Sequence, residues 1–131
     1  MRRDWIYYLA SPFSTPTVEG RAIAELKAER HHQVQFIGHQ LYELGFILIE
    51  PIASSYHKAL AFGAPGTYEY WKERDRKLVK ASDALMVATL DGWEDSVGVT
   101  DEISYAQELG KPVFLITVDE SMNVWRIQES S

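Results

Sequence analysis

The sequence has 131 residues and a mass of 15.0 kDa, the size of one ordinary domain. Hydrophobic residues make up 46% of it and charged residues 24%. That balance is typical of a globular protein and excludes disordered, collagen-like and membrane-spanning chains. The formal net charge of −6 argues against a nucleic-acid partner, because a phosphate backbone attracts basic surfaces. The absence of cysteine excludes disulfides, a thiol nucleophile and cysteine-ligated zinc.

The first half of the chain predicts two strands with a helix between them. Residues 5–10 are apolar on both faces, as in a buried parallel strand. This run is too short for a signal-peptide core or a membrane helix, so we expect a cytoplasmic protein with no membrane partner. After a loop over 11–17, apolar residues at helical spacing predict a helix over 23–44, ended by Gly45. A second buried strand is expected over 46–49.

The second half repeats this alternation. In chain order we expect a loop over 53–66, a helix over 68–81, a strand over 84–90, a helix over 97–109 and a strand over 113–118. The tail over 119–131 predicts at most one short helix. Buried strands that alternate with helices predict a single-domain α/β fold of the flavodoxin-like or Rossmann-like kind. Its parallel sheet would have four to five strands, with helices on both faces.

Ligands of such folds bind at the carboxyl ends of the strands. The sequence therefore places the chemistry in three connecting segments and in the first turns of the helices that follow them. These segments are residues 11–17, 51–66 and 91–96.

Two acidic residues stand on apolar helix faces. Glu102 shares a stripe with Ala106, near the start of its predicted helix, and Asp75 shares one with Leu78. Because burial of an unpaired carboxylate is costly, two such acids in one crevice have pKa values pushed apart, as acid–base or nucleophilic chemistry requires. Two plainer interpretations stay open. Glu102 could only stabilise a helix N-terminus, and Asp75 could pair at the surface with a neighbour such as Arg74.

Other motifs mainly exclude functions. The sequence has no Walker A motif, no G-x-G-x-x-G and no G-x-S-x-G, which argues against P-loop enzymes, dinucleotide-binding domains and serine hydrolases. The histidines lack metal-ligand spacing, so we expect no metal and no cofactor. Of Tyr7 and Tyr8, one should pack in the core while the other offers its hydroxyl to the crevice. Trp71 and Trp93 are either core residues or stacking platforms for a base.

Four pieces of sequence occur together in a recognisable order. They are Tyr8-Leu9-Ala10-Ser11-Pro12, then Asp75 eight residues before Asp83, then Ser96-Val97-Gly98-Val99-Thr100-Asp101-Glu102, and finally Gly110-Lys111-Pro112-Val113. Together they resemble the nucleoside 2-deoxyribosyltransferase superfamily, which includes 2'-deoxynucleoside 5'-phosphate N-hydrolases. The third piece matches that superfamily's Ser/Asp-x-Gly-x-x-x-Glu pattern. The resemblance spans the chain from Tyr8 to about Val118.

The resemblance implies a single domain over residues 1–131 that cleaves the N-glycosidic bond of a 2'-deoxynucleoside or its 5'-monophosphate. Glu102 would be the nucleophile at the anomeric carbon of the sugar. Asp75 would handle the proton on the departing base, and Tyr8 would orient Glu102 through a hydrogen bond. The deoxyribosyl group would pass to water or to another base.

Substrate contacts are expected from residues around the crevice, namely Ser96, Gly98, Ser11, Ser14, Pro51 and Trp93. Ser14 stands where monophosphate-cleaving members tend to have an arginine. The superfamily builds its pockets from two subunits, which implies a homodimer or a higher homo-oligomer.

Other functions stay open on the same fold. The main alternative is a non-catalytic nucleotide-binding or sensing module. A receiver-type phosphoacceptor domain is a further option, since Asp91 follows the third predicted strand. Its usual acidic pair is missing, however, because Leu9-Ala10-Ser11 stands after the first strand. A flavin-binding domain is the last option, indicated by the hydroxyl-rich loop over 11–17.

Overall fold

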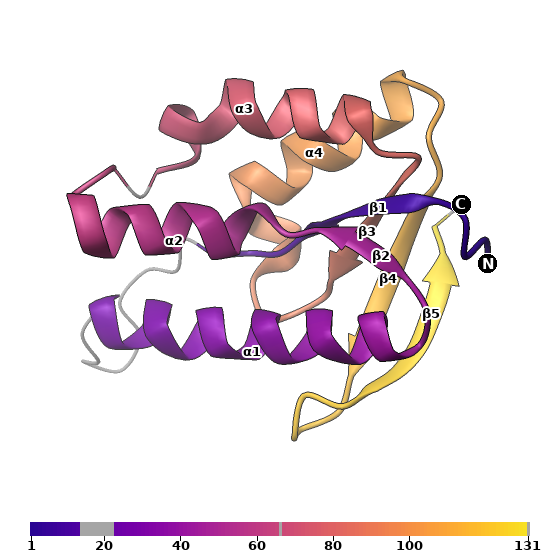
Figure 1. Cartoon of the computed structure of the whole chain (residues 1–131), viewed down its shortest axis with the longest axis horizontal. Helices are drawn as coiled ribbons and strands as arrows, with labels where there is room; N and C mark the ends of the chain where they lie inside the picture. Colours follow the sequence, from indigo (N-terminus) through magenta and orange to yellow (C-terminus); the bar gives the residue numbers. More distant parts are fainter. Residues whose placement is uncertain (14–22, 66, 131) are drawn as a thin grey trace.

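The computed structural model describes residues 1–13, 23–65 and 67–130, and one sheet forms its centre (Figure 1). The sheet has five strands in the order β2-β1-β3-β4-β5. In chain order they are β1 Ile6–Ala10, β2 Ile47–Ile49, β3 Ala84–Ala88, β4 Val113–Val118 and β5 Val124–Glu129. The first four are parallel, and β5 pairs antiparallel with β4. The predicted α/β fold with a mostly parallel sheet is confirmed.

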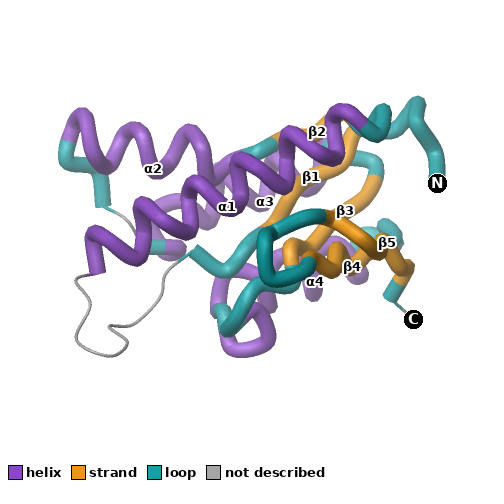
Figure 2. Tube along the Cα trace, turned by 90° about the horizontal axis from the view of Figure 1, so that it is seen from below, coloured by secondary structure: helices purple, strands orange, loops and turns teal. Residues whose placement is uncertain are grey.

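Helices lie on both faces of the sheet, also as predicted (Figure 2). They are α1 Ile23–Glu43, α2 Pro51–Phe62, α3 Tyr68–Ala81 and α4 Val97–Glu108, with the short 3-10 helix η1 Trp93–Asp95. On one face α1 packs through Val34 and Ile37. On the other face α3 packs through Val79, and α4 through Val99 and Ala106. No helix in the described part of the chain is long and apolar enough to cross a membrane.

The alternation of side chains along β1 sends its two tyrosines to opposite faces. Tyr7 lies in the core beneath α1, where its hydroxyl donates a hydrogen bond to the carbonyl of Arg2 at 2.8 Å. Its ring meets that of Phe46 edge to face. Tyr8 lies on the face covered by α3 and α4, with its hydroxyl at a cavity. The prediction that one tyrosine packs in the core and the other reaches the crevice is confirmed.

Helix α2 occupies most of the segment that the sequence predicts as a loop over 53–66, so that prediction is wrong. Pro51 takes the first helical position, where its missing N–H leaves no hydrogen bond unmade. Gly63 ends the helix with a φ of 69°, the left-handed conformation that glycine adopts without strain. Because the segment is helical, it brings Ser55 to the carboxyl edge of the sheet.

The tail forms strand β5 and not the short helix that the sequence predicts. The side-chain amide of Gln40, on α1, holds this hairpin in place. It donates to the carbonyl of Met122 at 2.8 Å and accepts from the N–H of Val124 at 2.9 Å. A contact between residues so distant in sequence leaves no trace in local periodicity, which explains the wrong prediction.

The remaining differences are small. β2 is an edge strand and not a fully buried one, with Ile47 49% exposed. The other predicted elements agree with the observed bounds to within about two residues, the usual uncertainty of element ends.

Candidate active site

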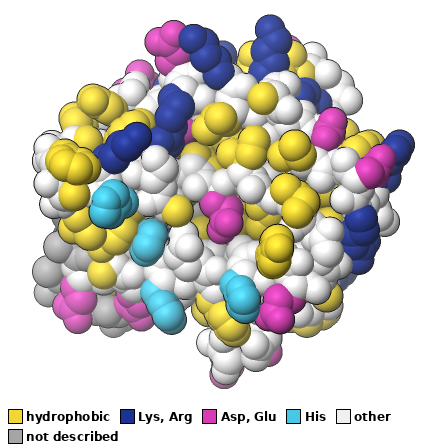
Figure 3. All heavy atoms as spheres, viewed as in Figure 1, with side chains coloured by type: hydrophobic (Ala, Val, Ile, Leu, Met, Phe, Trp, Pro, Cys, Tyr) yellow, Lys and Arg dark blue, Asp and Glu magenta, His cyan; other side chains and the backbone are white. Residues whose placement is uncertain are grey.

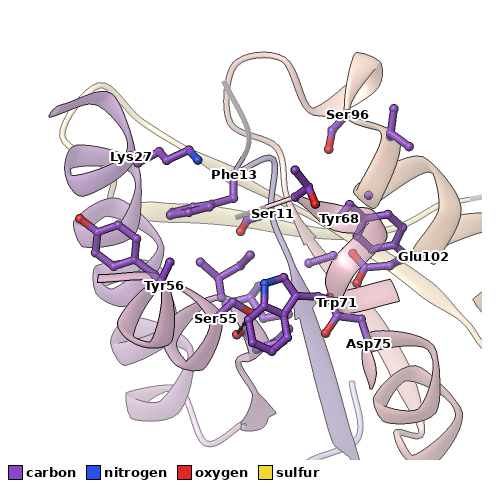
Figure 4. Close-up of a pocket in the computed structure, with 18 of the residues that line it drawn as sticks. Ser11, Phe13, Lys27, Ser55, Tyr56, Tyr68, Trp71, Asp75, Ser96 and Glu102 are labelled. Carbon is purple, nitrogen blue, oxygen red and sulfur yellow. Dashed lines mark hydrogen bonds between the residues drawn. The ribbon is translucent and has the colours of Figure 1, made fainter. Parts of the chain in front are cut away.

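A cavity of about 550 Å³ lies at the carboxyl end of β1, on the edge where the sequence predicts a crevice (Figure 4). The residues that follow β1 line it together with α2, the first two turns of α3 and α4, and Lys27 of α1. Phe13 and Tyr56 form one aromatic side, and Tyr68 and Trp71 form another. Its volume lies within the range of small-molecule sites.

Glu102 is buried in the wall of this cavity, with 5% of its surface exposed. It points inward from the second turn of α4, and the Tyr8 hydroxyl donates a hydrogen bond to its Oε2. Burial raises the pKa of Glu102 to about 8, with a further increase from the charges of Asp75 and Asp101, while the Tyr8 hydrogen bond acts in the opposite direction. The raised pKa favours the protonated form of this carboxyl group at neutral pH.

Asp75 lines the same cavity from α3 and is also only 5% exposed. The Nε and Nη2 atoms of Arg74 donate to its Oδ1 at 2.9 and 2.7 Å. Burial raises the pKa of Asp75, and the Arg74 cation opposes that rise. The predicted ion pair between Asp75 and Arg74 is therefore confirmed, but its predicted place at the surface is wrong, because the Asp75 carboxyl group is buried.

A second polar cluster joins α3 to α4 beside the cavity. The hydroxyl of Tyr68 donates to Asp101 Oδ2 at 2.5 Å, and Arg76 donates to both Asp101 oxygens at 2.5 and 3.0 Å. The guanidinium of Arg76 lowers the pKa of Asp101, which therefore stays ionised. Its charge, next to Glu102 in sequence, is one reason why Glu102 holds its proton.

Four of the residues expected to contact substrate line the cavity: Ser11, Pro51, Ser96 and Gly98. Ser11 is 6% exposed, and its buried Oγ has no hydrogen-bond partner in the described structure. Ser96 caps α4, where its Oγ accepts from the N–H of Val99 at 3.3 Å. Gly98 leaves room for a close neighbour, because an added Cβ would lie 3.0 Å from the ring of Tyr68.

The other two expected residues are not brought to the cavity. Trp93 lines a separate shallow cleft on the outer side of α4, beside Ile103. Trp93 is absent from the lining of the cavity that holds Glu102, so its expected contact with substrate finds no support in the geometry. Ser14 lies outside the described residues.

Sequence reasoning missed three polar residues that line the cavity or contact its acids. Ser55 was hidden by the wrong loop prediction for α2, and Arg74 was expected only as a surface partner. Lys27 belongs to a helix whose apolar pattern gives no sign that one side chain reaches a cavity. No group of three or more acidic or histidine side chains among the described residues is arranged to hold a metal ion.

The buried proton of Glu102 makes folding stability depend on pH. Its pKa is about 8 in the folded protein against an ordinary 4.5, so the folded state keeps a proton that the unfolded chain releases. The resulting stabilisation is complete below about pH 4.5 and is lost as the pH rises through about 8. We expect the free energy of unfolding to fall by up to about 1.4 kcal/mol per pH unit across this window through Glu102 alone.

Urea denaturation between pH 5 and 9 measures this effect. Glu102→Gln keeps the shape and the hydrogen bond from Tyr8 but carries no titrating proton, so its slope should be flatter and its stability above pH 8 should exceed that of the wild type. Glu108→Gln, at an exposed position of the same helix, should leave the slope unchanged. Equal slopes for the wild type and Glu102→Gln would contradict the raised pKa.

Comparison with known proteins gives the family but no activity. No curated protein matches the sequence significantly. One protein family, described as "Domain of unknown function (DUF1937)", matches residues 5–118, a stretch that begins before β1 and ends with β4. This stretch contains both buried acids and Tyr8. The chain therefore belongs to the DUF1937 family.

Proposed function

We propose that the protein cleaves the N-glycosidic bond of a 2'-deoxynucleoside or its 5'-monophosphate, with Glu102 as the nucleophile. The observation that carries this proposal is the pair of buried carboxyl groups, Glu102 and Asp75, that face one aromatic-walled cavity. Burying two carboxyl groups costs desolvation free energy. Cleavage of a glycosidic bond uses such a pair, with one carboxyl group as the nucleophile and the other as the acid and base. The sequence resemblance to nucleoside 2-deoxyribosyltransferases supports the same assignment.

In the first step, an oxygen of the ionised Glu102 forms a bond to the anomeric carbon while the bond from that carbon to the base nitrogen breaks. The electron pair of the broken bond leaves with the base, which takes a proton from the carboxyl group of Asp75. Positive charge develops on the sugar as this bond breaks, and a carboxylate in a poorly hydrated site stabilises it strongly. The product is a glycosyl ester on Glu102.

In the second step, water or a second base attacks the anomeric carbon and the ester bond to Glu102 breaks. The attacking group gives its proton to Asp75, which restores both acids to their starting state. Either acceptor fits this chemistry, since Asp75 serves as the base in this step after serving as the acid in the first.

The walls of the cavity suit a nucleoside. Trp71 and Tyr68 present aromatic surface beside the two acids, where a base can stack. Ser11 offers a free hydroxyl to a sugar oxygen. Lys27 is the single Lys or Arg side chain among the described residues that line the cavity, and the acids Glu69 and Asp95 line it too, so both a 2'-deoxynucleoside and its 5'-monophosphate stay in the proposal.

The proposal includes a second copy of the chain and a cytoplasmic location, where free nucleotides occur. Figure 3 shows hydrophobic side chains over α2, beside the Lys and Arg side chains that cover α3. Leu60 and Phe62 on α2 are 69% and 78% exposed, and Tyr70 on α3 is 55% exposed. Leu60 also lines the cavity, so a homodimer over this surface would narrow the entrance.

A base-release assay tests the proposed reaction. The purified protein should release free base from at least one 2'-deoxynucleoside or its 5'-monophosphate, detected by chromatography. Glu102→Gln should lower kcat by a factor on the order of 10³ or more, because the amide cannot form the ester. Glu108→Gln should retain the wild-type rate.

If no deoxynucleoside or deoxynucleotide is cleaved, the proposed reaction is wrong. Nucleotides that raise the melting temperature without turnover, equally in the wild type and in Glu102→Gln, would instead establish the non-catalytic nucleotide-binding module.

The two tyrosines of β1 provide a matched pair for the role of Tyr8. The Tyr8 hydrogen bond favours the ionised form of Glu102, so Tyr8→Phe should raise the pKa of Glu102. The limb of the kcat/KM profile that reports the ionisation of Glu102 should then move to higher pH by up to about one unit. Tyr7→Phe removes a hydroxyl from the opposite face of the sheet and should leave the profile in place. If the kcat/KM profile moves by the same amount in both variants, Tyr8 acts only through the stability of the fold.

A further inference from the structure

Arg74 is fixed more firmly than a surface arginine. Two of its nitrogens bind Oδ1 of Asp75, and Nη2 also donates to Ser55 Oγ at 2.6 Å and to the Pro51 carbonyl at 3.4 Å. Its guanidinium carbon lies 4.4 Å from the centroid of the Trp71 ring. Contacts with α2, with an aromatic ring and with a buried acid together leave this side chain little freedom, so its charge stays at Asp75.

The binding leaves the two oxygens of Asp75 in different states. Oδ1 accepts both arginine hydrogen bonds. In the described structure no hydrogen bond reaches Oδ2, although Asp75 lines the cavity. Arg74 therefore neutralises the charge of the carboxylate through Oδ1 and leaves Oδ2 to a ligand in the cavity.

Asp75 and Glu102 influence each other's ionisation. Asp101, from α4, carries negative charge near Glu102. Tyr8 from β1 and Tyr68 from α3 have raised pKa values, stay neutral and donate hydrogen bonds to Glu102 and Asp101. From α2, Ser55 and Pro51 contribute only a hydroxyl and a carbonyl to the contacts of Arg74. Two neighbouring acids cannot both ionise easily, so the one that is better stabilised ionises first and the other keeps its proton.

We propose that Arg74 is a positioning residue that decides which of the two acids ionises first, Asp75 ahead of Glu102. While Arg74 holds Oδ1, Asp75 is the better stabilised carboxylate and the shared proton lies on Glu102. The significance for catalysis rests on the proposed function, in which the reacting state has the opposite arrangement: an ionised Glu102 and a protonated Asp75. By favouring an ionised Asp75, Arg74 thus opposes the reactive arrangement of the two protons.

Carboxyl NMR of the full-length protein with ¹³C-labelled Asp and Glu side chains tests this inference. Asp75→Asn and Glu102→Gln assign the two signals. In Arg74→Met the pKa of Asp75 should rise by about one pH unit or more, because its cationic partner is gone. The pKa of Glu102, which Arg74 lowers only weakly, should rise less, so the two pKa values should approach each other. Arg74→Lys keeps the charge without the fork of two donors and should restore part of the difference.

Arg76 is the matched control. It lies on the same helix, binds Asp101 through the same kind of ion pair, and stacks on Tyr105 with a distance of 4.7 Å to the ring centroid. Asp101 does not line the cavity, so Arg76→Met should leave the titration of Asp75 unchanged. If Arg74→Met leaves both titrations as in the wild type, or if Arg76→Met moves Asp75 equally, the inference is wrong.

A kinetic comparison separates this inference from the proposed function. The maximum of kcat/KM for base release should increase in Arg74→Met, because a larger fraction of the protein then has an ionised Glu102 and a protonated Asp75. The changes in the NMR titrations without any base release would support the role of Arg74 at Asp75 and overturn the proposed reaction. Base release with an unchanged maximum of kcat/KM and unchanged titrations would support the reaction and overturn the role of Arg74.

Discussion

The burial of two carboxyl groups on one cavity wall is the constraint on which the rest of the site depends. Glu102 and Asp75 are each 5% exposed, and desolvation raises the pKa of both. A fold accepts that cost only where partners offset part of it. Tyr8 offsets it at Glu102 by hydrogen bonding, and Arg74 offsets it at Asp75 by an ion pair. The two acids are therefore stabilised by different means, which lets them differ in protonation and take different roles.

The fold brings these partners together through a few simple relations. Alternation along β1 sends Tyr8, and not Tyr7, to the face that α3 and α4 cover. The parallel strand order places the starts of the following helices at one edge, so acids in the second turns of α3 and α4 face one space. Helix α2 completes the cavity and anchors Arg74 through Ser55. A chain of 131 residues thereby encloses a cavity of small-molecule size.

The sequence predicts the sheet, α3, α4 and the inward position of both acids, because apolar periodicity records which side of an element faces the core. It also predicts that Ser11, Pro51, Ser96 and Gly98 lie at the crevice, since each follows or begins an element at the carboxyl edge. Periodicity fails for β5, whose strand form depends on pairing with β4, and for α2, whose flanking Gly63 and Pro65 suggest a loop. The contact of Arg74 with the buried Asp75 and the place of Lys27 at the cavity could not be predicted, because the direction of a long polar side chain depends on tertiary contacts.

The central claim is that Glu102 bonds transiently to a sugar carbon, and mass spectrometry of the protein quenched during turnover tests it most directly. The account predicts that a peptide containing Glu102 gains the mass of a deoxyribosyl group or its phosphate, and that the gain disappears in Glu102→Gln. Base release accompanied by a sugar on another residue would contradict it. So would base release that persists unchanged in Glu102→Gln.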